Sequence, residues 1–332
     1  MALTLTDIIQ EFGHYYLNNG QNRNRLLRGL MQPTETLNIP GIHHIRTDET
    51  IYQLANPMFT ELLQGFQKNF TPKGAVDFHP NTIQLRHLKV DHDLYPHDIE
   101  ESWLGFMGGD ASRTIEQWPI VRYIMEEYLM NQVLEDKENE VIYKGKYAAP
   151  TTNTANAASA TFDGLRKQLV DGAADSKYPI NVISTMGAAM TLADALDYIE
   201  QFVDKIDHKF QNKKMTIFVA PEVVRAYLRL KRNAGWYEIS QDSQLGVRVD
   251  FSNFTLQGVA SMIGTLDIFA TMPQNIIHLT KRDFSTAGID VQKHDRQVKL
   301  LIDWFEAVGF GCNQLVWTTT ETITAATAAL GA

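Results

Sequence analysis

The chain has 332 residues and a mass of 37.6 kDa, which is enough for two ordinary domains or one elaborate domain. Hydrophobic residues make up 44% and charged residues 21%, which excludes a largely disordered chain, and no run of 18 apolar residues offers a membrane span. The 30 Lys and Arg against 39 Asp and Glu give a net charge of −9, which argues against a protein that grips nucleic acid by neutralising its phosphates. The charge is still compatible with a protein that lines a space containing nucleic acid without gripping it.

Cysteine use and the opening residues bound the compartment. Cys312 is the only cysteine, so no intrachain disulfide can form, which fits assembly in a reducing compartment. The opening residues, MALTLTDIIQEFGHYY, carry no basic stretch followed by an apolar block. We therefore expect no secretory signal.

The first 60 residues are rich in Asn, Gln and Arg, and they show little periodicity after a short helical pattern at the start. This composition indicates an arm that needs neighbouring structure to hold it. Its one basic cluster, Arg23, Arg25 and Arg28, suits a contact with nucleic acid or with an acidic neighbour about as well as a solvated surface.

Residues 66–104 are predicted to be extended. Apolar residues alternate up to Leu85, and the phase then slips so that Leu88 and Val90 continue the pattern. This slip predicts a bulge near Arg86 and His87. Three prolines in the segment argue against a central sheet. A long polar hairpin is poorly stable alone, so we expect it to project from the body and pack on something else.

A strong helix is predicted at about residues 118–135. Trp118, Val121, Met125 and Tyr128 fall on one stripe, and Pro119 suits the first turn. A run of four charged residues is expected to end this helix. Residues 148–161 are small and polar, which is typical of a loop.

The second half of the chain alternates helix and strand patterns. A helix is predicted at about 192–208, capped by Thr191 with Asp194 three residues later. The apolar run at 215–219 is a buried strand by composition, and Pro221 opens a further helix that ends at Gly235. Residues 245–282 and 289–317 are predicted to be strands. The tail is rich in Thr and Ala, and we expect it to be frayed or held only by a neighbour.

One segment invites a metal interpretation. Six of the ten histidines fall between residues 43 and 97, with acidic residues around the last two: His43, His44, His79, His87, His92, His97, Asp91, Asp93, Asp98, Glu100 and Glu101. Histidine and carboxylate ligands suit zinc or iron. However, the spacing matches no standard site, and nothing places His92 and His97 on one face. A solvated or intersubunit polar strand is the favoured interpretation, with a metal-dependent hydrolase as an alternative.

Other catalytic signals are absent from the sequence. It contains no GxGxxG, GxxxxGK[ST], HExxH or GxSxG motif. Cys312 lies among predicted strand residues with nothing nearby to lower its pKa, so we expect a buried, inert thiol. We therefore assign no catalytic, cofactor-binding or metal-binding residue, and we expect no enzyme activity and no cofactor.

The order of these elements resembles that of the major capsid proteins of tailed bacteriophages, which have the Hong Kong 97-type fold. Three segments carry the resemblance: MTIFVAPEVVRAYLRLKRNAG, GVASMIGTLDIFATMPQNIIHLTKR and VQKHDRQVKLLIDWFEAVGFGCNQLVWT. The first is similar to the family's strand–helix unit, the second to its axial-domain strands, and the third to its closing strands. The Lys–Asn pair that cross-links subunits in some members has no counterpart that we can match.

The resemblance implies an α+β fold and a division of the chain. The expected parts are an N-terminal arm at 1–65, an extended β-hairpin loop at 66–104, a peripheral domain at 105–214 with a long spine helix at about 118–135, an axial domain at 215–285, return strands of the peripheral domain at 286–318 and a C-terminal tail at 319–332. A large cleaved scaffolding segment does not fit before the arm. The resemblance therefore implies a separate scaffold protein or none.

The resemblance also implies a function. A major capsid protein self-assembles into hexamers and pentamers of an icosahedral shell that encloses packaged phage DNA without sequence-specific binding. Its partners would be other copies of itself and virion proteins such as scaffold, portal or decoration proteins, with no membrane. It would lie in the virion capsid after assembly in the host cytoplasm. An encapsulin-like nanocompartment shell, which encloses an enzyme cargo, shares this fold and is a further alternative.

Overall fold

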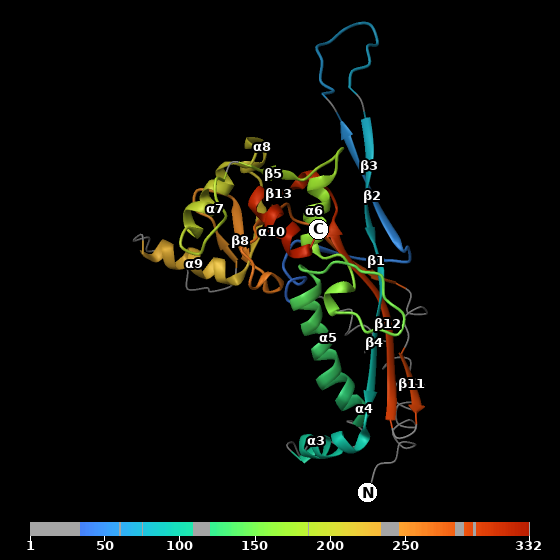
Figure 1. Ribbon diagram of the computed structural model, residues 1–332. Coiled ribbons are helices and arrows are strands. Elements are labelled where there is room, and N and C mark those ends of the chain that lie inside the picture. Colours follow the sequence, from blue (N-terminus) through green and yellow to red (C-terminus); the bar gives the residue numbers. More distant parts are fainter. Residues whose placement is uncertain are drawn as a thin grey trace.

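The computed structural model describes residues 34–59, 61–74, 76–108, 120–184, 186–233, 246–282, 289–294 and 297–331. One of its two main sheets is organised by its longest strand, β12 (Gln297–Phe310). Figure 1 shows β12 running along the length of an elongated molecule. The predicted alternation is confirmed, because the residues from Val298 to Trp304 that were expected to point inward are buried.

This first sheet has five strands. The strand β4 (Arg86–Leu94) pairs antiparallel with one part of β12, from Val298 to Glu306. The antiparallel strands β11 (Ile289–His294) and then β10 (Ile276–Lys281) also pair with β12, and β1 (Ile42–Thr47) lies parallel to β10. Segments from both ends of the chain therefore meet in one sheet.

The second sheet has six strands in the order β5 (Asn181–Ile183), β13 (Val316–Thr319), β9 (Phe269–Thr271), β6 (Met215–Val219), β8 (Phe254–Gly258) and β7 (Gly246–Arg248). Around it lie α7 (Ala195–Asp204), α8 (His208–Gln211) and α9 (Pro221–Asn233) (Figure 1). The predicted strand β6 and the helix that starts at Pro221 are confirmed. A helix was also predicted at about 192–208 with Thr191 as its cap, but α7 runs only from Ala195 to Asp204 and its N-cap is Asp194. Thr191 and Asp194 hydrogen-bond to each other in the turn before the helix.

The division expected at residue 214 differs from the packing. It would separate α7 from α9, yet these helices pack together and share one hydrophobic core with the first sheet. The return segment 286–318 likewise contributes β12 to the five-stranded sheet and β13 to the six-stranded sheet. None of the helices in the described ranges is long and apolar enough to cross a membrane.

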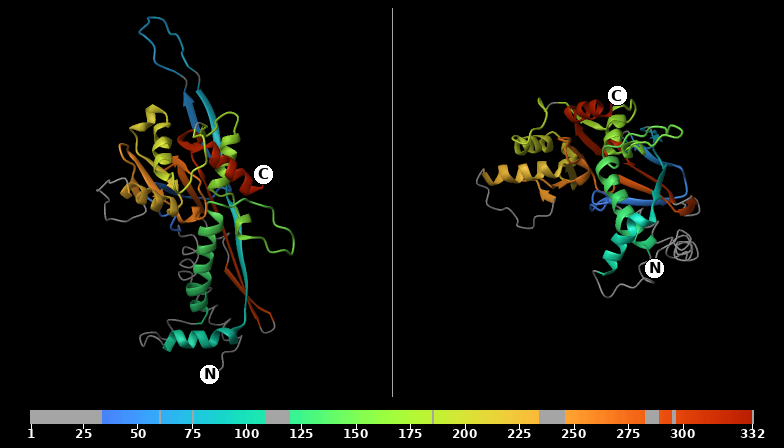
Figure 2. Two further views of the ribbon diagram at one scale, coloured as in Figure 1. Left: turned by 60° about the vertical axis from the view of Figure 1, so that its left-hand side comes forward. Right: turned by 60° about the horizontal axis from the view of Figure 1, so that its bottom comes forward.

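A two-stranded hairpin projects from the body (Figures 1 and 2). Its antiparallel strands are β2 (Ile51–Phe59) and β3 (Val76–Gln84). The predicted bounds of 66–104 were wrong, because β2 belongs to the segment expected to be an arm. A two-stranded ribbon has only edges, so it accommodates Pro57 and Pro80 within its strands.

The phase slip near Arg86 marks a change of partner. β3 pairs with β2, whereas β4 pairs with β12, and the single residue Leu85 separates the two strands. The bulge predicted there is therefore a crossing between sheets. The end of the predicted extended segment is wrong as well, because residues 96–108 form α3 (Pro96–Gly108), with Pro96 at the helix start, where a missing N–H costs little.

A long helix of residues 120–141, hereafter the spine helix, lies beside β4 and β12 (Figure 1). It consists of α4 (Ile120–Tyr123), a π-helical turn (Ile124–Leu129), α5 (Met130–Asp136) and a second π-helical turn (Lys137–Val141). The predicted helix is confirmed from residue 120. It does not end in the charged run, because Lys137 and Glu138 turn inward to buried partners. Residues 118 and 119 lie outside the described residues.

The spine helix ends against the start of α6 (Leu165–Ala174). The N–H groups of Leu165 and Arg166 donate to the carbonyls of Ile142 and Tyr143, at 2.9 Å each. The donors of one helix start thus satisfy carbonyls just past the end of another helix. The loop predicted at 148–161 has irregular structure apart from one 3₁₀ turn (Ala158–Ala160).

The tail was expected to be frayed or held only by a neighbour. It is instead a helix, α10 (Thr320–Leu330), so the frayed alternative was wrong. The Thr319 hydroxyl accepts from the Thr322 N–H at 3.2 Å, and Gly331 ends the helix at φ 64°. The helix packs against α6 with Ala326 fully buried. Small Ala and Thr side chains allow this close packing, which composition alone did not reveal.

Gly164 offers a test of the helix junction. A Cβ atom on Gly164 would lie 2.5 Å from the carbonyl oxygen of Val141 and 2.8 Å from those of Ile142 and Tyr143. We expect Gly164→Ala to lower the free energy of unfolding by about 1–3 kcal/mol in urea denaturation. Gly105→Ala is the matched control, because nothing lies within 4 Å of a Cβ there. Equal stability of the two variants would contradict this account.

Candidate functional site

The tip of the hairpin, residues 61–74, presents apolar side chains to water. Phe66 and Phe70 are each 93% exposed, and Leu63 is 85% exposed. Hydrogen bonds from Gln64 to the carbonyl of Thr71 and from Lys73 to the carbonyl of Leu63, at 2.8 and 2.7 Å, link the two sides of the tip. Large apolar side chains exposed to this extent are typical of a surface that another molecule covers.

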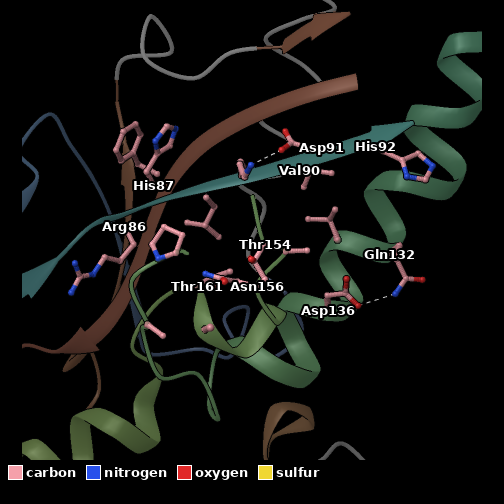
Figure 3. A pocket seen from close by; sticks show the side chains of 18 of the residues that line it. Arg86, His87, Val90, Asp91, His92, Gln132, Asp136, Thr154, Asn156 and Thr161 are labelled. Carbon is pink, nitrogen blue, oxygen red and sulfur yellow. Dashed lines mark hydrogen bonds and ion pairs between the residues drawn. The ribbon is translucent and has the colours of Figure 1, made fainter. Parts of the chain in front are cut away.

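A cleft of about 1540 Å³ lies between β4, the spine helix and the loop at 148–161 (Figure 3). From β4 come Leu88 and Val90, and from the helix come Ile124, Leu129 and Val133. Polar groups line the remainder. Figure 3 shows Thr154, Asn156 and Thr161 along the loop side, with Gln132 and Asp136 on the helix.

Four polar side chains of β4 that line the cleft have partners within the chain. The guanidinium of Arg86 lies 3.6 Å from the ring centroid of Tyr147, and the His87 ring stacks on Phe305 with centroids 4.4 Å apart. Lys89 Nζ donates to Asp91 Oδ2 at 2.5 Å. These contacts hold all four side chains, Arg86, His87, Lys89 and Asp91, against partners within the chain.

The early histidines are distributed over several elements. His43 and His44 lie in β1, His79 in β3, His87 and His92 in β4, and His97 in α3. His92 and Gln132 both line the cleft (Figure 3), whereas His97 follows the start of a separate helix. Among the described residues, no group of three or more His, Cys, Asp or Glu side chains is placed to hold a metal ion.

A buried ion-pair network lies where the spine helix meets the first sheet. Glu306, on β12, is fully buried, and Lys137 on the spine helix is 3% exposed. Lys137 Nζ donates to Glu306 Oε1 at 2.9 Å. The same carboxylate accepts from Trp304 Nε1 at 3.1 Å and from His278 Nε2, on β10, at 2.6 Å. One carboxylate therefore joins the helix to two strands.

A second histidine extends this network to β1. The Nδ1 atoms of His44 and His278 lie 3.0 Å apart, in strands paired in register at these residues. Two ring N–H groups cannot donate to each other, so this contact holds one proton. Burial, followed by the charge of His278, lowers the pKa of His44.

The described residues nearest the N-terminus are tied to the same end of the spine helix. The Thr36 hydroxyl donates to Glu138 Oε1, and the Thr36 N–H lies 3.3 Å from both oxygens of that carboxylate. Thr36 also contacts the Ser261 hydroxyl at 3.0 Å. Glu138 follows Lys137 directly, so one helical turn anchors both a strand and the entering chain.

The sequence pattern of β12 indicates that Glu306 is buried, although its residue type favours an exposed position. Alternation from Val298 through Trp304 continues to Glu306, which places its carboxylate on the buried face. Helical spacing from Leu129 likewise reaches Lys137 on the inner face.

Cys312, expected to be a buried thiol among strand residues, is only half-buried and lies in the turn after β12. The turn forms because the Asn275 side chain bonds both the N–H and the carbonyl of Cys312.

Comparisons with known proteins identify the fold. No family model matches the sequence, and no curated protein matches it significantly. Among solved structures, the chain is similar to the capsid of an empty GTA particle, with a TM-score of 0.55, 10% identity, and coverage of 87% of this chain and 90% of that chain. It is equally similar to the procapsid of satellite phage P4 with its size determination protein, at a TM-score of 0.55, 10% identity and 90% of each chain. The chain therefore has the α+β fold of tailed-phage major capsid proteins, as the sequence resemblance implied.

The buried carboxylate predicts an acid dependence of stability. Burial alone would raise the pKa of Glu306, but the Lys137 charge and the His278 hydrogen bond lower it from 4.5 to about 2. A carboxyl group whose pKa is lower in the folded than in the unfolded state stabilises the fold at pH values above its unfolded pKa. This stabilisation is lost as the pH falls toward the folded pKa. We therefore expect the free energy of unfolding to decrease from about pH 5 toward pH 2.

Glu306→Gln should flatten that decrease, as measured by urea denaturation at each pH. The matched control is Glu140→Gln, because Glu140 is an exposed carboxylate on the same helical turn as Lys137. The control should retain the wild-type slope. A Glu306→Gln variant with an unchanged slope would show that this carboxylate does not titrate with folding.

Proposed function

We propose that the chain is a non-enzymatic structural subunit that self-assembles into the hexamers and pentamers of a closed icosahedral shell enclosing packaged phage DNA. The observation that carries the proposal is the capsid-protein fold, which extends over 87% to 90% of both chains compared. The exposed apolar hairpin tip adds a second reason, because ordering and exposing such a segment is favourable only when another molecule covers it.

The charge of the chain is consistent with confinement of DNA. A net charge of −9 disfavours tight phosphate binding, so a shell of such subunits would enclose DNA without adhering to it. The proposal places the protein in the virion capsid after assembly in the host cytoplasm. Its further partners would be scaffold, portal or decoration proteins. The basic cluster at Arg23, Arg25 and Arg28 lies outside the described residues.

We assign the cleft of one subunit as the surface that receives the hairpin tip of an adjacent subunit. The tip offers Phe66 and Phe70, and the cleft offers an open volume with aliphatic side chains from β4 and the spine helix. Burying two phenylalanine side chains would contribute about 3–6 kcal/mol. The polar loop at 148–161 would form the rim of that contact.

Electron microscopy with light scattering of the recombinant full chain tests the proposed function. We expect closed particles or stable hexamers and pentamers, and we expect Phe66→Ser/Phe70→Ser to remain folded but to assemble poorly. The control is Lys68→Ser, which changes a polar exposed residue of the same tip. Nucleic acid in particles recovered from the native host would support a capsid, whereas an enzyme cargo would favour the nanocompartment. Wild-type protein that stays monomeric with a scaffold supplied would overturn the proposal.

Cross-linking tests the assignment of the cleft. Gly65 lies at the tip with open space around it, and Thr154 is exposed on the cleft loop. In a Cys312→Ser background, we expect Gly65→Cys/Thr154→Cys subunits to form a ladder of linked copies with a short bis-maleimide. Either cysteine alone should give no linked species beyond dimers. Normal particles without a ladder would show that the tip lies on another surface.

A further inference from the structure

Helix α7 carries an acidic stripe on the face turned away from the core. Asp197, Glu200 and Asp204 follow one another at spacings of three and four residues. At about 100° per residue, this stripe lies opposite the buried face, which is formed by Ala195, Tyr198, Ile199, Phe202 and Val203. Within the described residues, none of the three carboxylates has an ion-pair partner.

Helix α9 carries the opposite charge in the same arrangement. Arg225, Arg229 and Arg232 are exposed, and they lie opposite the buried face that includes Val223 and Tyr227. In the part of the chain that the structure describes, no carboxylate forms an ion pair with any of these arginines. The helix already uses another cation, Lys231, for its internal pair with Asp250 at 2.7 Å.

Each stripe is unfavourable in an isolated subunit. Like charges three and four residues apart destabilise a helix by a few tenths of a kcal/mol per pair, and both stripes contain two such pairs. The pKa of the half-buried Glu200 is raised, first by burial and then by the charges of Asp197, Asp250 and Asp204, and the charge of Lys231 on α9 only partly opposes this rise. Although α7 and α9 pack together, no ion pair joins the acidic stripe to the three arginines within the described residues. An external partner would relieve both repulsions.

The spacings of the two stripes match when the helices run antiparallel. From Asp197, the acidic residues lie at intervals of three and seven residues, and from Arg232 backwards the arginines lie at the same intervals. With a rise of about 1.5 Å per residue, the charges recur at about 4.5 and 10.5 Å along both helices. Antiparallel packing would pair Asp197 with Arg232, Glu200 with Arg229 and Asp204 with Arg225.

We infer that α9 of one subunit docks antiparallel on α7 of the next subunit through these three charge pairs. The contact joins two different surfaces, so it is head-to-tail, and repetition of such a contact closes a ring. The inference rests on the proposed shell function and supplies its contact within a hexamer or pentamer. Because bidentate Arg–carboxylate pairs are directional, the contact would also fix the register of neighbouring subunits.

Charge reversal in the full chain tests this contact. We expect Arg229→Glu alone, or Glu200→Arg alone, to raise the protein concentration needed for assembly by about tenfold or more, because each juxtaposes like charges. The combined variant Glu200→Arg/Arg229→Glu restores opposite charges between every pair of copies and should recover most assembly. Lys177→Glu, which makes the same charge change at an exposed residue, should assemble like wild type. Thermal unfolding of each unassembled variant confirms that it folds.

The outcomes separate the two levels of the proposal. If wild type assembles and both single reversals assemble equally well, the helix contact is wrong and the shell function stands. Failure of the combined variant to recover, with both singles impaired and folded, would also overturn the pairing. If wild type itself forms no oligomer, the shell function and the contact fall together. Light scattering in about 0.1 M and 1 M salt provides a second readout, because screening at high salt should weaken a charged contact.

Discussion

The buried pair of Lys137 and Glu306 is the constraint on which the arrangement of the molecule depends. A carboxylate without access to water requires its partners, and here they come from a helix and two strands. Loss of one member of such a pair costs about 3–5 kcal/mol, so the spine helix cannot leave β12 without exposing an uncompensated charge. The neighbouring Glu138 holds the entering chain, and the cleft lies between the spine helix and β4, the strand that pairs with β12.

The elements defined by local patterns could be predicted from the sequence. The strand β6, the helix from Pro221 and the alternating positions of β12 each follow from spacing within a few residues. The elements that were missed depend on distant partners. β2 pairs with β3 in a register that no local signal near Ile51 specifies, and the Thr/Ala tail is a helix because α6 lies beside it.

The site was predicted less completely than the fold. The histidine-rich segment attracted attention because its residue types are close in sequence, yet its members are distributed over several elements. The histidine that His44 contacts is His278, which lies 234 residues away. Likewise, the charged run that includes Lys137 was predicted to end a helix, because nothing near Lys137 in the sequence reveals its buried partner Glu306. The sequence of one segment does not identify polar partners that lie in distant elements.

The join between hairpin and body has a mechanical consequence. β3 ends at Gln84 and β4 begins at Arg86, and just before the join the Ile83 side chain sits against Gly309, where a Cβ atom would lie 2.9 Å away. A nine-residue strand spans about 30 Å, so a small rotation of the hairpin about this contact would be amplified at its far end. A tilt of about 5° at the Ile83–Gly309 contact would move the far end of the strands by roughly 3 Å. In the proposed shell, such a tilt would let one sequence contact neighbouring subunits at different local curvatures.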